Sequence, residues 1–110
     1  LDLSSGARAG LTAFMAGIAR SVAGANVTIN FLLPGAFDTD RLKATMEGAV
    51  KKTGKPMEEI ADARRKTIPA ARFGTSDEFG ATCAFLCSAH ASYITGQNVL
   101  IDGGAYPGTY

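Results

Sequence analysis

The sequence has 110 residues, of which 46% are hydrophobic, and a formal net charge of +1 at neutral pH. This length fits one small domain or part of a larger one. The near-zero charge argues against a nucleic acid or a membrane surface as partner. No apolar run approaches the roughly 20 residues of a membrane span, and no secretory signal is visible at Leu1. We expect a cytoplasmic protein, because its two cysteines are interpreted below as reduced. Because the chain starts with Leu1 and not with Met, we expect a processed chain or part of a longer one.

Residues 4–22 are predicted to form an amphipathic helix, because apolar residues recur there at helical spacing. A second stripe of small residues would permit close approach of another helix or strand, although glycine inside a helix costs roughly 1 kcal/mol relative to alanine. The apolar stripe is Ala7, Leu11, Phe14, Met15, Ile18, Ala19 and Val22, and the small stripe is Gly6, Gly10, Ala13 and Gly17. Gly24 is expected to end the helix.

The run from Val27 to Leu33 predicts a buried strand that stops at Pro34-Gly35. Proline cannot donate to a sheet ladder, and glycine tolerates backbone angles that other residues avoid. In open parallel sheets, ligands bind just beyond the carboxyl ends of the strands. The residues after Leu33 are therefore a candidate binding loop, with the alternative that Pro-Gly merely ends a strand.

Residues 40–70 are predicted to contain two helices around a polar, glycine-containing segment. A short helix over 40–46 would be capped by Asp38 or Thr39. Residues 47–55 are expected to be mobile, and Pro56 suits the start of a second helix over 57–66. The cations at the end of that helix match its dipole, which we favour over an anion site.

Thr75 and Glu78 form a predicted capping box that opens a helix over 76–88. Residues 98–102 are the second predicted strand, and Tyr93 is expected to pack in the connector that precedes it. Cys83 and Cys87 lie four residues apart in the helix, a spacing that rarely suits a disulfide. Two thiols also make an incomplete zinc site, so we predict no metal site and interpret both as buried, reduced cysteines.

Two strands joined by helices predict an α/β protein with parallel strands. The strand over 27–33 is apolar along its whole length, so it should be covered on both faces and paired on both edges. Only one other strand is predicted. We infer that the missing edge and face come from preceding chain or from another molecule.

Three segments, in this order, resemble the short-chain dehydrogenase/reductase family, particularly members of the 3-oxoacyl-acyl-carrier-protein reductase type. They are Thr28-Ile-Asn-x-x-x-Pro-Gly-x-x-x-Thr39, Arg72-Phe-Gly-Thr-Ser-Asp-Glu78 and Ser92-Tyr-Ile-Thr-Gly-Gln-x-Val-x-Ile-Asp-Gly-Gly104. The resemblance implies the C-terminal half of a Rossmann-like, doubly wound parallel sheet. Residues 1–110 would then be the C-terminal part of one domain, without the dinucleotide-binding N-terminal half, and this part alone is expected to be inactive.

The resemblance also implies a function: hydride transfer between NADP or NAD and a small carbonyl or alcohol substrate. This chain would supply the loop beside the nicotinamide and a substrate lid over 40–70. The family's cofactor contacts fall on Pro34, Gly35, Ala36, Phe37 and Thr39. The family's usual assembly implies a homodimer or homotetramer, and the missing N-terminal half is the other expected partner.

The family's catalytic Tyr-x-x-x-Lys motif falls on Ser4 and Arg8, which is a departure from the pattern. A serine hydroxyl is a poor proton donor unless it is activated, and arginine does not replace lysine at a shaped site. Three interpretations stay open. The protein uses a different acid, or it binds cofactor but turns over slowly, or Ser4 is a helix cap and Arg8 a surface charge.

A second function of another class is a non-catalytic scaffold or oligomerisation domain. The missing tyrosine and lysine favour it. The loop from Pro34 to Thr39 disfavours it, because a pure scaffold does not need this loop.

Overall fold

The computed structural model describes residues 2–108, and the side chains of residues 3–108. The chain falls into two compact units, each built from two separate stretches. The first unit is Leu1–Leu33 with Thr82–Val99, and the second is Pro34–Ala81 with Leu100–Tyr110. Both β-strands and the last α-helix pass from one unit into the other along the chain, so the units share elements but are described separately below.

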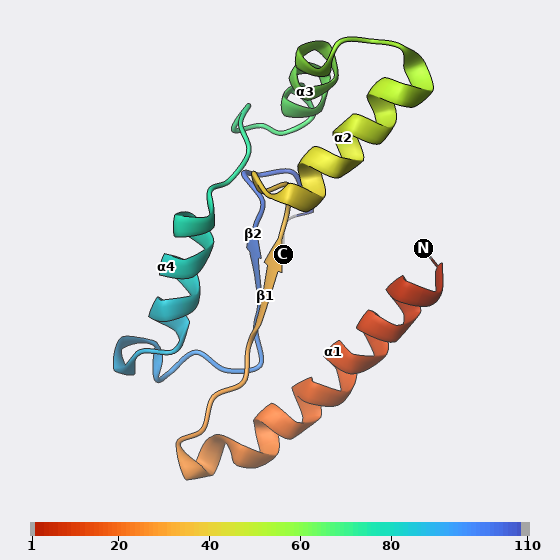
Figure 1. Ribbon diagram of the computed structural model, residues 1–110. Helices are drawn as coiled ribbons and strands as arrows, with labels where there is room; N and C mark the ends of the chain where they lie inside the picture. Colours follow the sequence, from red (N-terminus) through yellow and green to blue (C-terminus); the bar gives the residue numbers. More distant parts are fainter. Residues whose placement is uncertain (1, 109–110) are drawn as a thin grey trace. The chain divides into compact units, whose positions relative to one another are not determined.

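Two short parallel strands form the sheet, β1 (Phe31–Pro34) and β2 (Asn98–Ile101), which lie side by side in Figure 1. The Phe31 N–H donates to the Gln97 carbonyl (2.9 Å), and the Gly35 N–H donates to the Ile101 carbonyl (3.0 Å). Both sequence numbers rise together, as parallel pairing requires. The sheet confirms the expected parallel strands, and the helix-rich α/β architecture matches the C-terminal part of a Rossmann-like sheet.

The first strand begins at Phe31, four residues later than the sequence predicts, because side chains replace part of its ladder. The Ile29 N–H donates to the Thr95 hydroxyl (3.1 Å). Asn30 donates from Nδ2 to the Ile94 carbonyl and accepts at Oδ1 from the Gln97 N–H, at 2.9 and 3.0 Å. Asn30 thus bridges two residues of the connector that leads into β2. A run of apolar residues in the sequence does not reveal that a polar side chain within it replaces hydrogen bonds of the strand ladder.

The first unit contains α1 (Asp2–Val22), which agrees closely with the predicted helix. A 3-10 turn, η1 (Ala23–Ala25), continues it, and Asn26 ends the turn in the left-handed region at φ 62°. The prediction that Gly24 ends the helix is therefore wrong. Asparagine is the other residue that tolerates this conformation, since its short polar side chain bonds locally.

Much of the apolar stripe on α1 is exposed in this chain. Phe14 keeps 66% of its accessible surface and Leu11 keeps 52%, whereas Ala19 is buried. A Cβ added at Gly6, Gly10 or Gly17 would meet no atom within 4 Å. The small-residue stripe therefore has no close neighbour within the described residues, 2–108.

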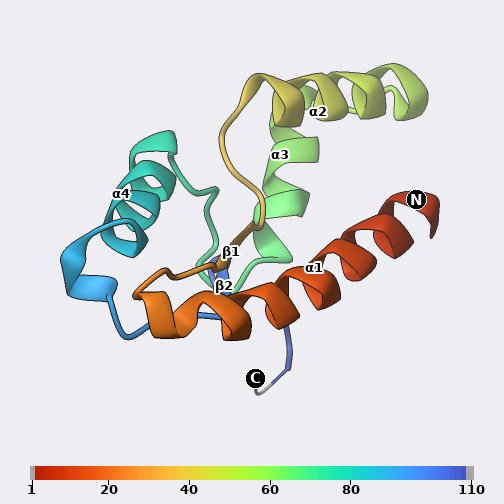
Figure 2. The same cartoon turned by 90° about the horizontal axis from the view of Figure 1, so that it is seen from below.

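The second unit contains α2 (Asp40–Thr53) and α3 (Met57–Lys66), which pack against each other and are seen from two directions in Figures 1 and 2. The predicted mobile segment over 47–55 is wrong for its first seven residues, because α2 continues to Thr53. Gly54 then ends it in the left-handed region at φ 73°. The apolar cluster of this unit contains Leu42, Met46 and Ala61, with Met57, Ile60 and Phe73 packed against it. This burial outweighs the polar composition that suggested mobility.

The last helix, α4 (Ser76–Leu86), starts at the predicted position and ends earlier than predicted. A 3-10 turn, η2 (Ala89–Ala91), follows it. Along α4, Phe79 and Leu86 are half-buried, whereas Cys83 and, directly after the helix, Cys87 are exposed. The prediction of buried cysteines is therefore wrong for this chain. Tyr93, expected to pack in the connector, is fully exposed.

Candidate functional site: the loop after the first strand

The loop 34–39 connects the end of β1 to the start of α2, and it begins with a close backbone approach. A Cβ added at Gly35 would lie 2.7 Å from the Asp102 Cβ and 2.8 Å from the Asp102 Cα. Only glycine leaves room for the chain at this position. The Asp102 carboxylate accepts from the Gly104 and Tyr106 N–H groups, both at 3.0 Å, so it organises the residues that follow β2.

Phe37, at the centre of the loop, forms an isolated parallel bridge with Gly74. The Asp38 N–H donates to the Gly74 carbonyl (2.8 Å), and the Gly74 N–H donates to the Ala36 carbonyl (3.0 Å). In this pattern the N–H and C=O of Phe37 itself point away from Gly74. Among the described residues, neither group has a hydrogen-bond partner. The main chain of Phe37 therefore holds one donor and one acceptor that are directed away from Gly74.

The Phe37 side chain also anchors the loop, by packing against Phe79 and Gly74. Phe37 is buried, with 9% of its accessible surface exposed, and its ring meets the Phe79 ring edge-to-face at 5.7 Å and 89°. A Cβ added at Gly74 would lie 2.6 to 2.9 Å from three carbons of the Phe37 ring. The buried Phe37 ring thus holds the loop in place, and it fits there only because residue 74 is a glycine.

Thr39 is the N-cap of α2, one of the two predicted caps. Its Oγ1 accepts from the Leu42 N–H at 3.3 Å, and its backbone is extended. A hydroxyl carries one donor and two acceptor lone pairs, so the Thr39 O–H can still donate to a ligand. The cap and a ligand contact are therefore compatible at this residue.

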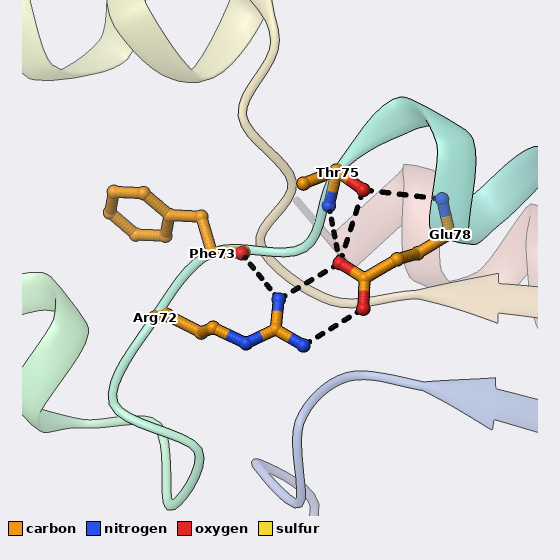
Figure 3. Close-up of polar contacts among 4 residues, drawn as sticks. All are labelled: Arg72, Phe73, Thr75 and Glu78. Atoms are coloured by element: carbon orange, nitrogen blue, oxygen red, sulfur yellow. Dashed lines mark hydrogen bonds and ion pairs between the residues drawn. The ribbon is translucent and has the colours of Figure 1, made fainter.

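Arg72, Thr75 and Glu78 form a polar network beside the Gly74 bridge (Figure 3). Arg72 donates from Nη1 and Nη2 to the two carboxylate oxygens of Glu78, both at 2.8 Å, and Nη1 also reaches the Phe73 carbonyl at 3.2 Å. The capping box is confirmed: the Thr75 N–H donates to Glu78 Oε1 (2.9 Å), and the Glu78 N–H donates to Thr75 Oγ1 (3.2 Å).

The hydrogen bonds from Arg72, followed by that from the Thr75 N–H, lower the pKa of Glu78 from 4.5 to about 2. The same hydrogen bond raises the pKa of Arg72 above its usual value. Bidentate pairing of a guanidinium with a carboxylate favours the charged form of both groups. The network therefore stays ionised at neutral pH.

The predicted pair Ser4 and Arg8 lies on α1, in the first unit. Both residues are exposed, and the Arg8 Nε donates to the Ser4 carbonyl at 3.3 Å. Because α1 already begins at Asp2, Ser4 lies inside the helix and is not its N-cap. The interpretation of Ser4 as a helix cap is therefore wrong, whereas the exposure of Arg8 agrees with a surface charge.

A groove of about 690 Å³ lies in the first unit and is lined by α4 and the chain before β1. Cys83 and Cys87 form part of its wall, and it contains none of the predicted site residues. Within residues 2–108, no group of three or more histidine, cysteine or acidic side chains is placed to hold a metal ion. No helix in this described part has the length and apolarity needed to cross a membrane.

Sequence reasoning missed the contribution of Arg72 and Gly74. The segment 72–78 stood out only as a family resemblance and a capping box. The spacing of Arg72 and Glu78, six residues apart across a turn, gives no periodic signal. The glycine contact with Phe37 joins residues 37 positions apart, so it required the tertiary structure.

The cations that end α3 pair mainly with acidic residues of the same helix. Arg65 lies 3.1 Å from Glu58 and 3.6 Å from Asp62, and Lys66 lies 3.9 Å from Asp62. The Arg65 guanidinium also lies over the Phe73 ring, 5.3 Å from its centroid. These contacts agree with the preference for a structural helix end over an anion site.

Comparison with known proteins places this chain in a family. The family model for enoyl-(acyl carrier protein) reductase matches residues 2–106. The chain is 40% identical over 80 residues to the NADPH-dependent reductase BacG of Bacillus subtilis, covering 73% of this chain and 31% of that protein. It is 36% identical over 104 residues to the 3-oxoacyl-[acyl-carrier-protein] reductase FabG of Salmonella typhimurium, covering 91% and 36%.

Solved structures agree with the sequence comparisons. The crystal structure of YwfH, an NADPH-dependent reductase involved in bacilysin biosynthesis, matches with a TM-score of 0.82 and 36% identity, covering 91% of this chain and 38% of that one. The chain spans about a third of the length of the curated relatives above. Fold, family match and relatives agree, and the chain belongs to the short-chain dehydrogenase/reductase family, with similarity to its 3-oxoacyl-acyl-carrier-protein reductases.

Proposed function

We propose that the polypeptide containing this chain is an NAD(P)-dependent oxidoreductase that acts on a small carbonyl or alcohol substrate. In the reducing direction, a bound nicotinamide would supply the hydride for the carbonyl carbon, and a side chain of the protein would supply the proton for the carbonyl oxygen. Membership of the family and the NADPH-dependent activities named for BacG and YwfH support this proposal. This chain would contribute the nicotinamide loop, 34–39, and the substrate lid, 40–70.

The observation that carries the proposal is the unpaired main chain of Phe37. Its main-chain N–H and C=O have no partner among the described residues, and the bridge to Gly74 directs both away from the protein segment beside them. A carboxamide has one acceptor and one donor group, which complement this pair. The Thr39 hydroxyl, two residues on, supplies a further donor.

The loop residues therefore fit a nicotinamide group on donor and acceptor chemistry. The cofactor, when bound, would supply or accept the hydride. Gly35 would bring the chain close to Asp102 at the end of β2, and the buried Phe37 ring would keep the main chain of the loop in one orientation. Pro34 and Ala36 would complete the loop, Ala36 through its carbonyl bond with Gly74.

The proton donor is the open part of the mechanism. Ser4 and Arg8 occupy the positions of the family's tyrosine and lysine, and we propose them as the residues that replace this pair. Arg8 is fixed near Ser4 by its bond to the Ser4 carbonyl, one turn away on the same helix. A guanidinium that also reached the Ser4 hydroxyl would favour the ionised form of that hydroxyl, which is the direction needed for a serine to act as an acid–base group.

A first experiment measures binding of NADPH and NADH by the complete natural polypeptide, using quenching of protein fluorescence and a thermal shift. Saturable binding at micromolar to millimolar concentration is expected. Turnover of a panel of ketones and aldehydes, followed by loss of NADPH absorbance, then tests the reaction. A protein that binds neither cofactor at millimolar concentration would overturn the proposal.

The role of Ser4 is tested separately, with the variants Ser4→Ala and Ser4→Tyr in the complete polypeptide. If Ser4 is the acid, Ser4→Ala lowers kcat by at least about 100-fold, the usual contribution of a positioned acid or base. Ser4→Tyr restores the family's residue and is expected to retain or raise kcat. Unchanged turnover in Ser4→Ala would show that Ser4 is not the acid.

A non-catalytic scaffold is the second candidate function, and the exposure of α1 favours it. Phe14 and Leu11 present an apolar surface of the kind that assembly interfaces use. The family scaffold would then serve to associate subunits as a homodimer or homotetramer. Cofactor binding without turnover on any carbonyl substrate, together with a stable oligomer in sedimentation experiments, would support this alternative.

A further inference from the structure

We propose that Arg72, Gly74 and Glu78 are positioning residues for the cofactor, acting through the loop 34–39. This inference rests on the proposed function and deepens it, because it names which residues outside the loop set the loop's geometry. The residues 72–75 are called the clamp segment below. All of the contacts that carry the argument lie within the second unit.

The first step is the register between the loop and the clamp segment. Two hydrogen bonds, from Asp38 N–H to the Gly74 carbonyl and from Gly74 N–H to the Ala36 carbonyl, bracket Phe37. Losing the register would rotate the peptide groups on either side of Phe37. The hydrogen bonds with Gly74 therefore set the orientation of the Phe37 N–H and C=O, the two groups that we propose bind the carboxamide.

The second step is the glycine itself. The Phe37 ring occupies the space where any other residue at position 74 would place its Cβ, at 2.6 to 2.9 Å from the ring carbons. The ring is also held edge-to-face by Phe79, which limits how it can move aside. A side chain at position 74 would therefore displace Phe37, and the main chain of the loop would move with it.

The third step is the anchor of the clamp segment. Arg72 donates a hydrogen bond to each carboxylate oxygen of Glu78 and a further one to the Phe73 carbonyl (Figure 3). The same Glu78 carboxylate accepts a hydrogen bond from the Thr75 N–H. The residues before and after Gly74 are thus tied to one carboxylate in the first turn of α4. An arginine–carboxylate fork gives geometric specificity that a single charge does not.

The test uses the complete natural polypeptide and two ligands. One is NADPH, and the other is adenosine 2′,5′-bisphosphate, which carries the adenosine part of NADPH and lacks the nicotinamide. For a protein that prefers NADH, the pair is NADH and AMP. A positioning role for the nicotinamide loop affects only the first ligand of each pair, whereas general loss of structure affects both.

Gly74→Ala is expected to weaken NADPH binding about tenfold and to leave binding of the adenosine fragment within twofold. Gly80→Ala is the matched control, because a Cβ there meets no atom within 4 Å. It is expected to bind both ligands as the wild type does. Equal weakening of both ligands by Gly74→Ala, or unchanged NADPH binding, would overturn the inference.

Glu78→Gln provides a second variant if Gly74→Ala does not fold. It keeps the size of the side chain and removes the charge that pairs with Arg72. The expected result is a smaller loss of NADPH binding, about threefold, with the fragment again unaffected. Wild-type protein that binds neither NADPH nor NADH would overturn the proposed function and this inference together, whereas normal NADPH binding in both variants would overturn the inference alone.

Discussion

The two units differ in how much of their structure is stabilised within the described chain. The second unit buries Phe37, Leu42, Met46, Ala61 and Ile68, and its helices carry caps and ion pairs. Among its residues with described side chains, the first unit buries only the small side chains of Ala19 and Ala91, and it exposes several large apolar ones. Local interactions between near neighbours in sequence can complete a helix pair, whereas a sheet and the helix over it need surfaces from more distant chain. The predictions below test this contrast, from the largest expected effect to the smallest.

The sharpest test is the same truncation in both units of the complete polypeptide. Leu42→Ala removes a side chain that is 6% exposed from the apolar cluster of the second unit, and it should cost about 2 to 5 kcal/mol in the free energy of unfolding. Leu11→Ala, at a residue that is 52% exposed in the described chain, should cost less than about 1 kcal/mol where no other chain covers α1. Urea denaturation measures both.

An equal cost at the two leucines would break the comparison. It would mean that α1 is covered in the natural protein by other chain or by another subunit. Repeating the measurement at several protein concentrations separates these cases, because only association between subunits makes the midpoint depend on concentration.

Gly35→Ala tests the close approach of the loop to Asp102. The added Cβ would lie 2.7 to 2.8 Å from the Cα and Cβ of Asp102, so the backbone must shift, and overpacking of this kind costs about 1 to 3 kcal/mol. Gly48→Ala is the matched control, since the same addition in α2 meets open space and should stabilise the helix by up to about 1 kcal/mol. Thermal unfolding should move in opposite directions for the two variants, and movement in the same direction would contradict the contact.

Thr39→Ala tests the N-cap of α2. Removing the hydroxyl that accepts from the Leu42 N–H should cost about 1 kcal/mol, and Thr39→Ser should recover most of it. Hydrogen exchange at the amides of the first turn of α2 reports the loss locally. A uniform change of exchange throughout the second unit would contradict a purely local cap.

The smallest expected effect is a pH dependence from Glu78. Its pKa is about 2 in the folded protein and 4.5 without its partners, so its contribution to stability is fully present above pH 4.5 and is lost as the pH falls toward 2. Because both side chains of the pair are well exposed, solvent and salt weaken the contribution. Thermal unfolding of Glu78→Gln between pH 6 and 2.5 should show a shallower slope than the wild type, and identical slopes would contradict the pairing.

Local chemistry in the sequence was enough to predict most helix starts and the order of elements. The hydroxyls of Thr39 and Thr75 cap helix N-termini, which residue type and spacing predict. Pro56 directly precedes α3, and the predicted range of α3 agrees with the structure. Those signals act between residues three or four apart, so a single chain displays them. The family resemblance followed from short motifs, and the comparisons confirm it.

Burial was decided only by the tertiary structure. The sequence alone suggested a mobile segment at 47–55, buried cysteines and a packed Tyr93, because polar composition and residue type predict burial only on average. Residues 47–53 are helical because α2 packs on α3. The cysteines are exposed because no described part of the chain covers them.

The sequence by itself determined where α2, α3 and α4 start, the caps at Thr39 and Thr75, and the loop that follows β1, because these depend on residues close together in the chain. Only the tertiary structure decided what the loop rests on. Gly74 is 37 residues from Phe37, and Asp102 is 67 residues from Gly35, yet each fits against its partner with no space for a further carbon. Contacts of this kind leave no periodic trace in a sequence, since they depend on two distant segments reaching the same place.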